Sequence, residues 1–227
     1  MSFDVLDEHE QGELVQKWLR ENALSIAAGV GLGLALIFGW QQWKSHRAQH
    51  ASEAAGQYQA LTDAVDAKRD DEIDKIALSV RKDFPDSAYA VFAAMTQADI
   101  AAKKNDLAGA ASALDWAQQH ASDASLKSLA SLRLAKVKLA QGDADAALKM
   151  VDALPKDDYP SFAAEIRGDA LARQGHADAA RTAYQDAITH LDPQSTNRSF
   201  LQMKLDDLAA SSTPAPAPAP AAEKAGS

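Results

Sequence analysis

The sequence contains no cysteine, which excludes disulfide bonds, cysteine nucleophiles and thiolate metal sites. Glycine and proline are also scarce, with 11 and 8 residues among 227, and this argues against an all-β fold with many tight turns. Basic residues are outnumbered by acidic ones, 23 against 32, and the formal net charge is −9. A nucleic-acid-binding protein needs a basic surface to neutralise phosphates, so no nucleic-acid partner is expected.

Alanine, in contrast, is abundant and occupies 50 of the 227 positions. It has the highest intrinsic helix propensity and a low strand propensity. Hydrophobic residues make up 47% of the chain and charged residues 24%, which is typical of a folded protein rather than a disordered one. The composition therefore predicts an all-α fold.

One stretch, residues 23–40, is long, apolar and free of charged side chains. In helical form it spans about 27 Å, close to the roughly 30 Å hydrocarbon core of a bilayer. Trp18 precedes the stretch, and Trp40 and Trp43 lie at its end, where indole rings favour the membrane interface. We therefore predict a single transmembrane helix over residues 23–43.

Two other kinds of segment contain such a stretch. A buried core helix is rarely apolar on every face over this length. A cleaved signal peptide begins with a short basic region and has small residues at a cleavage site soon after the apolar run. Here residues 1–22 are acidic, and Trp40-Gln41-Gln42-Trp43 is a poor cleavage site. We therefore expect an uncleaved anchor.

The charges beside the anchor do not set its orientation. Lys17 and Arg20 precede it, and Lys44 and Arg47 follow it, so the positive-inside comparison is a tie. These charges therefore do not indicate on which side of the membrane the larger domain lies.

Ahead of the anchor, four apolar residues fall on one helical face: Leu14, Val15, Trp18 and Leu19. They predict a short amphipathic helix on the membrane surface within the acidic segment 1–22. Because the opposite face is acidic and would be repelled by anionic lipid, a protein partner is the alternative.

Small residues recur one helical turn apart within the anchor, as Gly29/Gly33, Gly31/Ala35 and Ala35/Gly39. Such pairs let a second helix approach closely in lipid, so we predict a helix–helix contact there. The alternative is the ordinary glycine and alanine content of membrane helices.

The rest of the chain contains an internal repeat. Three similar strings begin at Asn105, Gly142 and Gly175, which gives a period of roughly 34 residues, as in tetratricopeptide repeats. Each string is expected to form the turn between two helices. At constant distances from the strings lie small residues where the paired helices must pack closely: Ala98, Ala135 and Gly168 before, and Ala110, Ala147 and Ala180 after.

The predicted organisation is an α-solenoid behind the anchor. A linking helix pair over residues 44–85 precedes three repeats and a capping helix over residues 86–210. The last segment, residues 211–227, is rich in proline and alanine and is expected to be disordered. The repeats are divergent, because Ala94, Ser131 and Ala164 stand where the first helix usually has a large residue.

The repeat register predicts a protein-binding groove on the face of the first helices. It directs three residues of each repeat toward this groove: Phe92, Met95 and Asp99; Leu129, Leu132 and Lys136; and Phe162, Glu165 and Asp169. A mixed apolar and acidic groove suits unfolded or helical protein segments, including exported polypeptides with basic regions. The alternative is that the apolar members belong to the core.

No catalytic, cofactor-binding or metal-binding residue is predicted, and we do not expect an enzyme. His46, His50 and Glu53 share one helical face, but a fourth metal ligand is missing. Ser79-x-x-Lys82 matches a motif of penicillin-interacting enzymes, but its partner motifs are absent, so we attribute the match to chance.

The region around the anchor carries the most specific pattern, Val15-x-x-Trp18-x-x-x-Asn22 followed by Gly39-Trp40-x-x-Trp43-x-Ser45-His46. The repeats add Leu132-Arg-Leu-Ala-Lys-Val137 and Arg167-Gly-Asp-Ala-Leu171. From about residue 10 to residue 208, the sequence resembles the YfgM family of bacterial inner-membrane proteins.

The resemblance implies a cytoplasmic N-terminus, a periplasmic repeat domain and association with the SecYEG translocon. It also implies partnership with the membrane-anchored chaperone PpiD and transfer of exported polypeptides to periplasmic chaperones. A cell-envelope scaffold of the same architecture that does not touch the translocon is the main alternative, and an anchored enzyme is a third.

Overall fold

The computed structural model describes residues 8–211, and within that range the chain forms helices and no strands. The first residues of the acidic segment and nearly all of the proline- and alanine-rich segment lie outside it. The helices are α1 (Glu8–Asp66), α2 (Asp70–Asp83), α3 (Ala88–Lys103), α4 (Leu107–His120), α5 (Ala124–Ala140), α6 (Ala144–Asp152), α7 (Pro160–Arg173), α8 (Ala177–Thr189) and α9 (Asn197–Ser211). The all-α prediction is confirmed.

Helix α1 carries the apolar stretch. An uncharged window of this helix is long and apolar enough to cross a membrane, and none of that window is buried within the structure. Leu36 and Phe38 are 66% and 71% exposed. A core helix would bury such side chains against neighbours, so these exposures favour the membrane anchor over the core-helix alternative.

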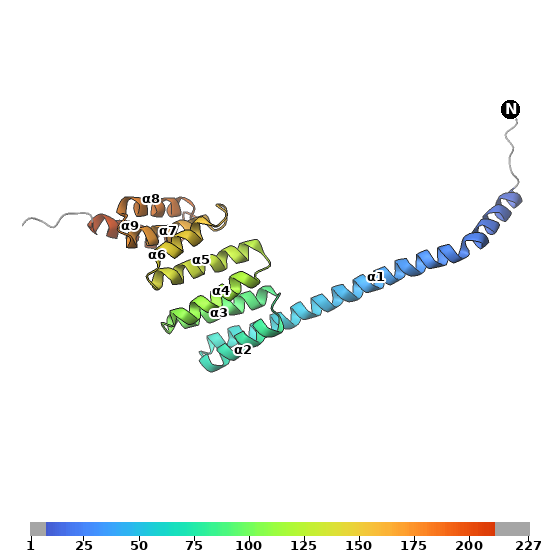
Figure 1. Ribbon diagram of the computed structural model, residues 1–227, viewed down its shortest axis with the longest axis horizontal. Coiled ribbons are helices and arrows are strands. Elements are labelled where there is room, and N and C mark those ends of the chain that lie inside the picture. Colours follow the sequence, from blue (N-terminus) through green and yellow to red (C-terminus); the bar gives the residue numbers. More distant parts are fainter. Residues whose placement is uncertain (1–7, 212–227) are drawn as a thin grey trace, which may run out of the picture. The chain divides into compact units, whose positions relative to one another are not determined.

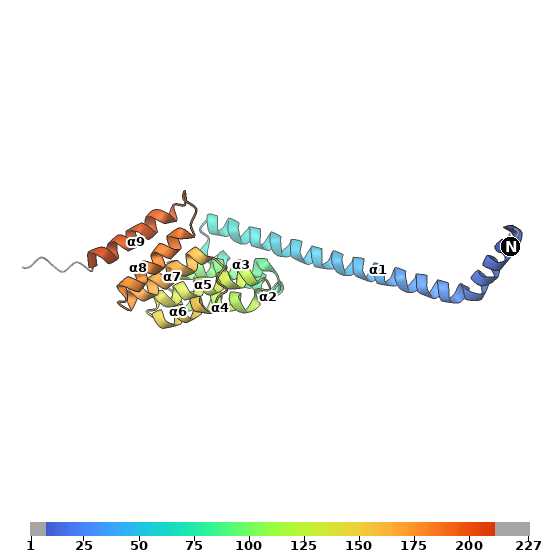
Figure 2. The same ribbon diagram turned by 90° about the horizontal axis from the view of Figure 1, so that it is seen from above.

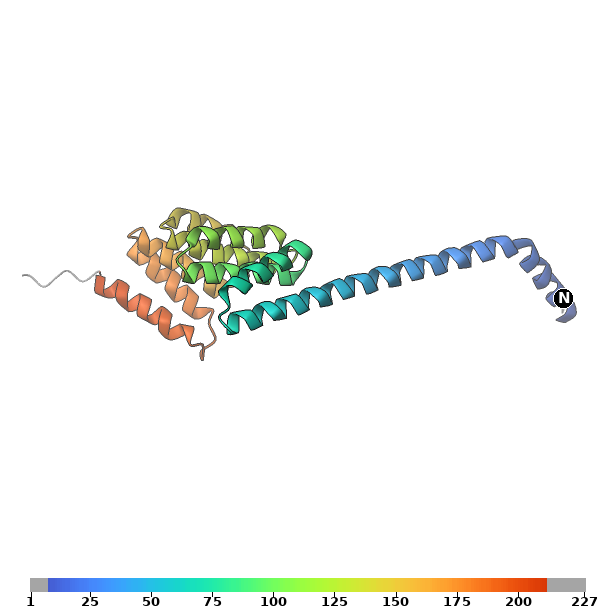
Figure 3. The same ribbon diagram turned by 90° about the horizontal axis from the view of Figure 1, so that it is seen from below.

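The chain divides into two compact units, residues 1–53 and residues 54–227. In the second unit, helices α2 to α9 follow one another in chain order (Figure 1). The helices pair as α3/α4, α5/α6 and α7/α8, and α9 packs against α8 (Figure 2). The end of α1, from Ala54 onward, packs beside α2 through Leu61 and Ile73 (Figure 3).

The three aligned strings form the turns within the pairs. Asn105, Gly142 and Gly175 each adopt a left-handed backbone, with φ of 61°, 87° and 79°. In every turn the next backbone N–H donates to a carbonyl five residues earlier, as from Asp106 to the oxygen of Ala101 at 2.8 Å. This is the hydrogen bond that ends a helix around a left-handed residue, which explains why glycine or asparagine stands there.

The same turns start the second helices. The Asp106 carboxylate accepts a hydrogen bond from the N–H of Gly109 at 2.9 Å, and Asp143 accepts one from Ala146 at 3.0 Å. These are N-caps that satisfy otherwise unpaired helix donors. His176 takes this place in the third repeat and forms no side-chain cap.

Close packing between the paired helices occurs at the small residues that the register identifies. Ala98, Ala110, Ala135, Ala147 and Ala180 are each at most 1% exposed. At Gly168 the approach is so close that a Cβ atom there would overlap with the ring of Tyr184. Four hydrophobic clusters fill the space along the helix stack, and the last contains Leu201 of the capping helix α9.

We expect Gly168→Leu and Ala147→Leu to destabilise the domain. Neither site has room for a larger side chain, and overpacking costs about 1–3 kcal/mol. Thermal unfolding of the detergent-solubilised chain, followed by circular dichroism, should show a melting temperature lower by several degrees. Gly56→Leu is the control, because a Cβ at that helical glycine meets nothing within 4 Å. Melting curves of Gly168→Leu and Ala147→Leu that match the control would contradict the helix pairing described here.

Candidate protein-binding groove

The nine predicted groove residues differ widely in exposure. Asp99 and Lys136 are exposed, whereas Phe92, Leu129, Phe162, Glu165 and Asp169 are partly buried. Met95 and Leu132 are only 3% and 0% exposed and belong to hydrophobic clusters between the helices. In this structure these two residues therefore pack in the core, while the other seven still reach the surface.

The aromatic residues among the nine already have neighbours. The ring of Phe92 lies 5.9 Å from that of Tyr58, near the end of α1. The ammonium of Lys136 lies 5.8 Å from the ring centroid of Phe162, a cation–π geometry that links α5 with α7. Each ring therefore bridges two helices and also keeps part of its surface accessible.

Asp99 pairs with a basic residue of the next repeat. Its carboxylate accepts from Nη1 of Arg133 at 3.1 Å, and the side chains are 58% and 36% exposed. Exposed ion pairs of this kind contribute little to stability, about 0–1 kcal/mol, because water screens them. Asp99 can therefore exchange Arg133 for another cationic partner at little cost in free energy.

The acidic residues of the third repeat bind a lysine of the capping helix. Nζ of Lys204 lies 2.8 Å from Glu165 and 2.7 Å from Asp169. The three side chains are 18%, 13% and 21% exposed, so this network is largely shielded from water. Charge-assisted hydrogen bonds are stronger in such surroundings. The repeat register did not reveal Lys204 as the partner of Glu165 and Asp169.

Tyr184 of α8 also belongs to this network. Its hydroxyl donates to Oδ1 of Asp169 at 2.7 Å, and the Lys204 ammonium lies 5.5 Å from its ring centroid. Burial, together with the hydrogen bond to Asp169, raises the pKa of Tyr184 far above its usual range. The phenol therefore remains a hydrogen-bond donor throughout the physiological pH range.

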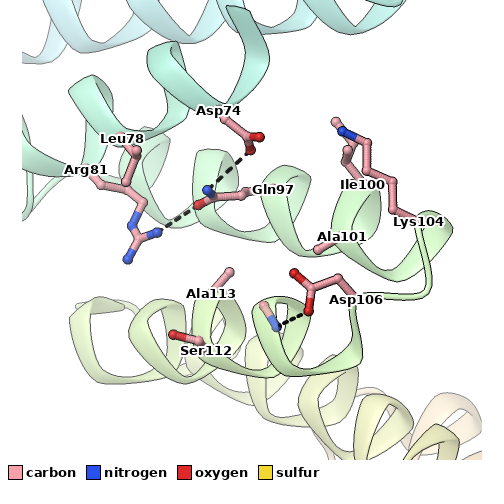
Figure 4. A pocket seen from close by; sticks show the side chains of 11 residues that line it. Asp74, Leu78, Arg81, Gln97, Ile100, Ala101, Lys104, Asp106, Ser112 and Ala113 are labelled. Carbon is pink, nitrogen blue, oxygen red and sulfur yellow. Dashed lines mark hydrogen bonds between the residues drawn. The ribbon is translucent and has the colours of Figure 1, made fainter. Parts of the chain in front are cut away.

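A separate cavity of about 450 Å³ lies among α2, α3 and α4 (Figure 4). At its edge Nη1 of Arg81 donates to Gln97 at 2.8 Å, and the Gln97 amide donates to Asp74 at 3.4 Å. The Arg81 guanidinium also lies 4.4 Å from the ring centroid of Trp116, and burial lowers its pKa. This polar bridge between helices was not predicted, since its members are distant in sequence and follow no repeat pattern.

The histidine pattern of His46, His50 and Glu53 lies on α1, and the Ser79-x-x-Lys82 pattern lies on α2. The rings of His46 and His50 are 6.5 Å apart, and within residues 8–211 no group of three histidine, aspartate or glutamate side chains is placed to hold a metal ion. Ser79 donates to the carboxylate of Asp83 at 2.8 Å on the surface of α2.

The predicted contact residues of the anchor all lie on α1. A Cβ atom at Gly29, Gly31, Gly33 or Gly39 would meet nothing within 4 Å. These positions are therefore open to a helix from another protein, and the contact, including Ala35, stays a prediction.

We expect Lys204→Met to destabilise the domain by about 1–3 kcal/mol, because it leaves two largely shielded carboxylates without their cation. The free energy of unfolding can be measured in urea with the detergent-solubilised chain. A triple variant that adds Glu165→Gln and Asp169→Asn should recover most of the loss, because no unpaired charge remains. Equal stability of Lys204→Met and the parent chain would show that the network contributes nothing.

Known proteins similar in sequence to this chain indicate its family. Residues 16–210 match the tetratricopeptide repeat-like domain family. A protein of Escherichia coli (strain K12) is 32% identical over 206 residues, covering 89% of this chain and 97% of the relative. A protein of Haemophilus influenzae is 28% identical, covering 92% and 100%, and one of Neisseria gonorrhoeae is 30% identical, covering 85% and 89%.

All three relatives are named ancillary SecYEG translocon subunits. The match to the family model extends over the apolar helix as well as the repeats, since it begins at residue 16. Together with the helix pairs and the membrane-length apolar helix, these matches place the chain in the YfgM family of ancillary SecYEG translocon subunits, whose members have a tetratricopeptide repeat-like domain.

Proposed function

We propose that this protein is a single-pass accessory subunit of the SecYEG translocon in the bacterial inner membrane. The observation that carries the proposal is the similarity over nearly the whole chain to proteins with that name. The apolar, unburied part of α1 supports membrane anchoring. The small residues from Gly29 to Gly39 would let α1 approach a translocon helix closely.

The repeat domain would act by binding protein rather than by catalysis. Its accessible first-helix residues combine partly buried aromatic rings, such as Phe92 and Phe162, with the exposed charges of Asp99 and Lys136. Such a surface can hold exported polypeptides and the membrane chaperone PpiD through apolar contacts, with charge steering the approach. The domain would thereby help to pass exported chains to periplasmic chaperones.

The proposed topology has residues 1–22 in the cytoplasm and the chain from Lys44 onward in the periplasm. A reporter enzyme that is active only in the periplasm, fused after Leu208, should therefore be active. A matched fusion after Asn22, ahead of the anchor, should be inactive. A stably produced but inactive fusion after Leu208 would reverse the topology.

Site-specific crosslinking in intact membranes tests the proposed function. We expect the parent chain to crosslink to the translocon, and the repeat domain to crosslink to PpiD and exported polypeptides. Phe92→Ser combined with Phe162→Ser should weaken the crosslinks of the domain, because it removes the apolar surface of the groove. Leu78→Ser, at a side chain that is 54% exposed and outside the nine positions, is the control.

Melting temperatures of the same variants separate binding from folding. If the two rings mainly stabilise the hydrophobic core, the double variant should have a much lower melting temperature, since truncating a buried phenylalanine costs about 3–5 kcal/mol. Unchanged crosslinks on a fully stable double variant would contradict binding through the groove. Absence of any translocon crosslink from the parent chain would favour an envelope scaffold instead.

A further inference from the structure

A second cleft, distinct from the groove, lies among α4, α5, α6 and the turn after α6. Its volume is about 440 Å³, within the range of roughly 300–1,000 Å³ that is typical of ligand pockets. Met150, Leu154 and Pro155 provide apolar lining, and Lys127 and Lys149 stand beside them. None of the nine groove residues lines it.

The cleft is open because a small residue stands where these repeats usually carry a large one. Ser131 occupies that place in the second repeat and is 4% exposed. Its hydroxyl donates to the backbone oxygen of Lys127 at 2.9 Å, and the neighbouring Ser128 donates to Asp158 at 2.5 Å. Both hydroxyls are therefore satisfied within the domain, so an apolar guest would leave neither without its hydrogen bond.

The charge of the cleft is opposite to that of the chain as a whole. Its lining contains two lysines and no carboxylate, although the net charge of the protein is −9. Within residues 8–211, neither Lys127 nor Lys149 forms an ion pair. Both ammonium groups are thus available to a partner.

Nearby carboxylates are held by other groups. On α6, Asp145 accepts from the amide of Gln174 at 2.6 Å, and Asp152 pairs with Arg167 at 2.9 Å. At the start of α5, Asp123 accepts from the N–H of Leu126 at 2.8 Å and caps the helix. These contacts hold the acidic side chains in place, as Ser128 holds Asp158. The charged side chains that line the cleft itself are Lys127 and Lys149.

We propose that this cleft binds a large apolar side chain from a protein segment that carries acidic residues on both sides of it. The apolar side chain fills the space beside Ser131 and against Met150 and Leu154. The flanking carboxylates pair with Lys127 and Lys149. This site goes beyond the proposed groove, and it selects a partner of the opposite charge to a basic exported segment.

Peptide binding to the full-length chain in detergent micelles tests the proposal. The probe is a short, fluorescently labelled synthetic peptide with one tryptophan between acidic residues, and fluorescence anisotropy gives its dissociation constant. We expect saturable binding that weakens with added salt. Two comparison peptides, with alanine in place of tryptophan or lysines in place of the acidic residues, should bind at least about tenfold more weakly.

Two cleft variants locate the binding. Lys127→Glu combined with Lys149→Glu should raise the dissociation constant by about tenfold or more, because it replaces two attractive charges by repulsive ones. The matched control, Lys75→Glu with Lys103→Glu, changes two exposed lysines of α2 and α3 and should leave binding nearly unchanged. Ser131→Phe should fill the cleft, abolish binding and preserve the melting temperature.

Equal binding of the acidic and basic peptides would overturn the proposal, and so would unchanged binding by the lysine variant. If Ser131→Phe lowers the melting temperature, the charge-reversed pair on the exposed surface still decides the outcome. The groove variant Phe92→Ser with Phe162→Ser tests whether the groove takes part in binding the peptide. We expect this variant to leave binding of the acidic peptide intact. Loss of peptide binding in that stable double variant would place the peptide in the groove and refute the cleft.

Discussion

The close approach of the two helices in each repeat is the constraint on which the rest of the domain depends. Ala98, Ala135 and Gly168 allow each second helix to lie against its partner. Larger residues of the second helices fill the space that remains: Leu114, Val151 and Tyr184. This packing fixes the rotation of every first helix. It therefore determines which side chains reach the surface as a possible groove and which, like Met95 and Leu132, are buried.

The sequence predicted the parts of the structure that depend on local repetition. The membrane-length helix, the all-α fold and the turns within the repeats follow from local patterns, such as the strings that begin at Asn105, Gly142 and Gly175. Contacts outside the repeat pattern were not predictable in the same way. Lys204 lies 39 positions from Glu165 in the sequence, and no periodicity links them. The cleft beside Ser131 was not predictable either, because a small residue indicates empty space only when the positions of its neighbours are known.

Several surface residues of the predicted groove already have partners within the domain. Asp99 pairs with Arg133, Lys136 packs over Phe162, and the acidic residues of the third repeat hold Lys204. A partner that uses these side chains exchanges existing contacts for new ones, so the net gain in free energy is smaller than the list of contacts suggests. Such exchange favours weak and reversible binding, which suits the proposed transfer of exported polypeptides.

The pairing of Gly168 with Tyr184 also constrains how the third repeat could have arisen. The first two repeats set Ala98 with Leu114 and Ala135 with Val151, whereas the third sets glycine with tyrosine. With alanine at 168 the Cβ atom would overlap with the tyrosine ring, whereas glycine beside a smaller residue would leave only a small void, at a helix-propensity cost of about 1 kcal/mol. If the two positions change one at a time, the overlap is avoided only when glycine comes before tyrosine. A return to alanine would displace the ring and break the hydrogen bond from its hydroxyl to Asp169, so the two positions are coupled in evolution.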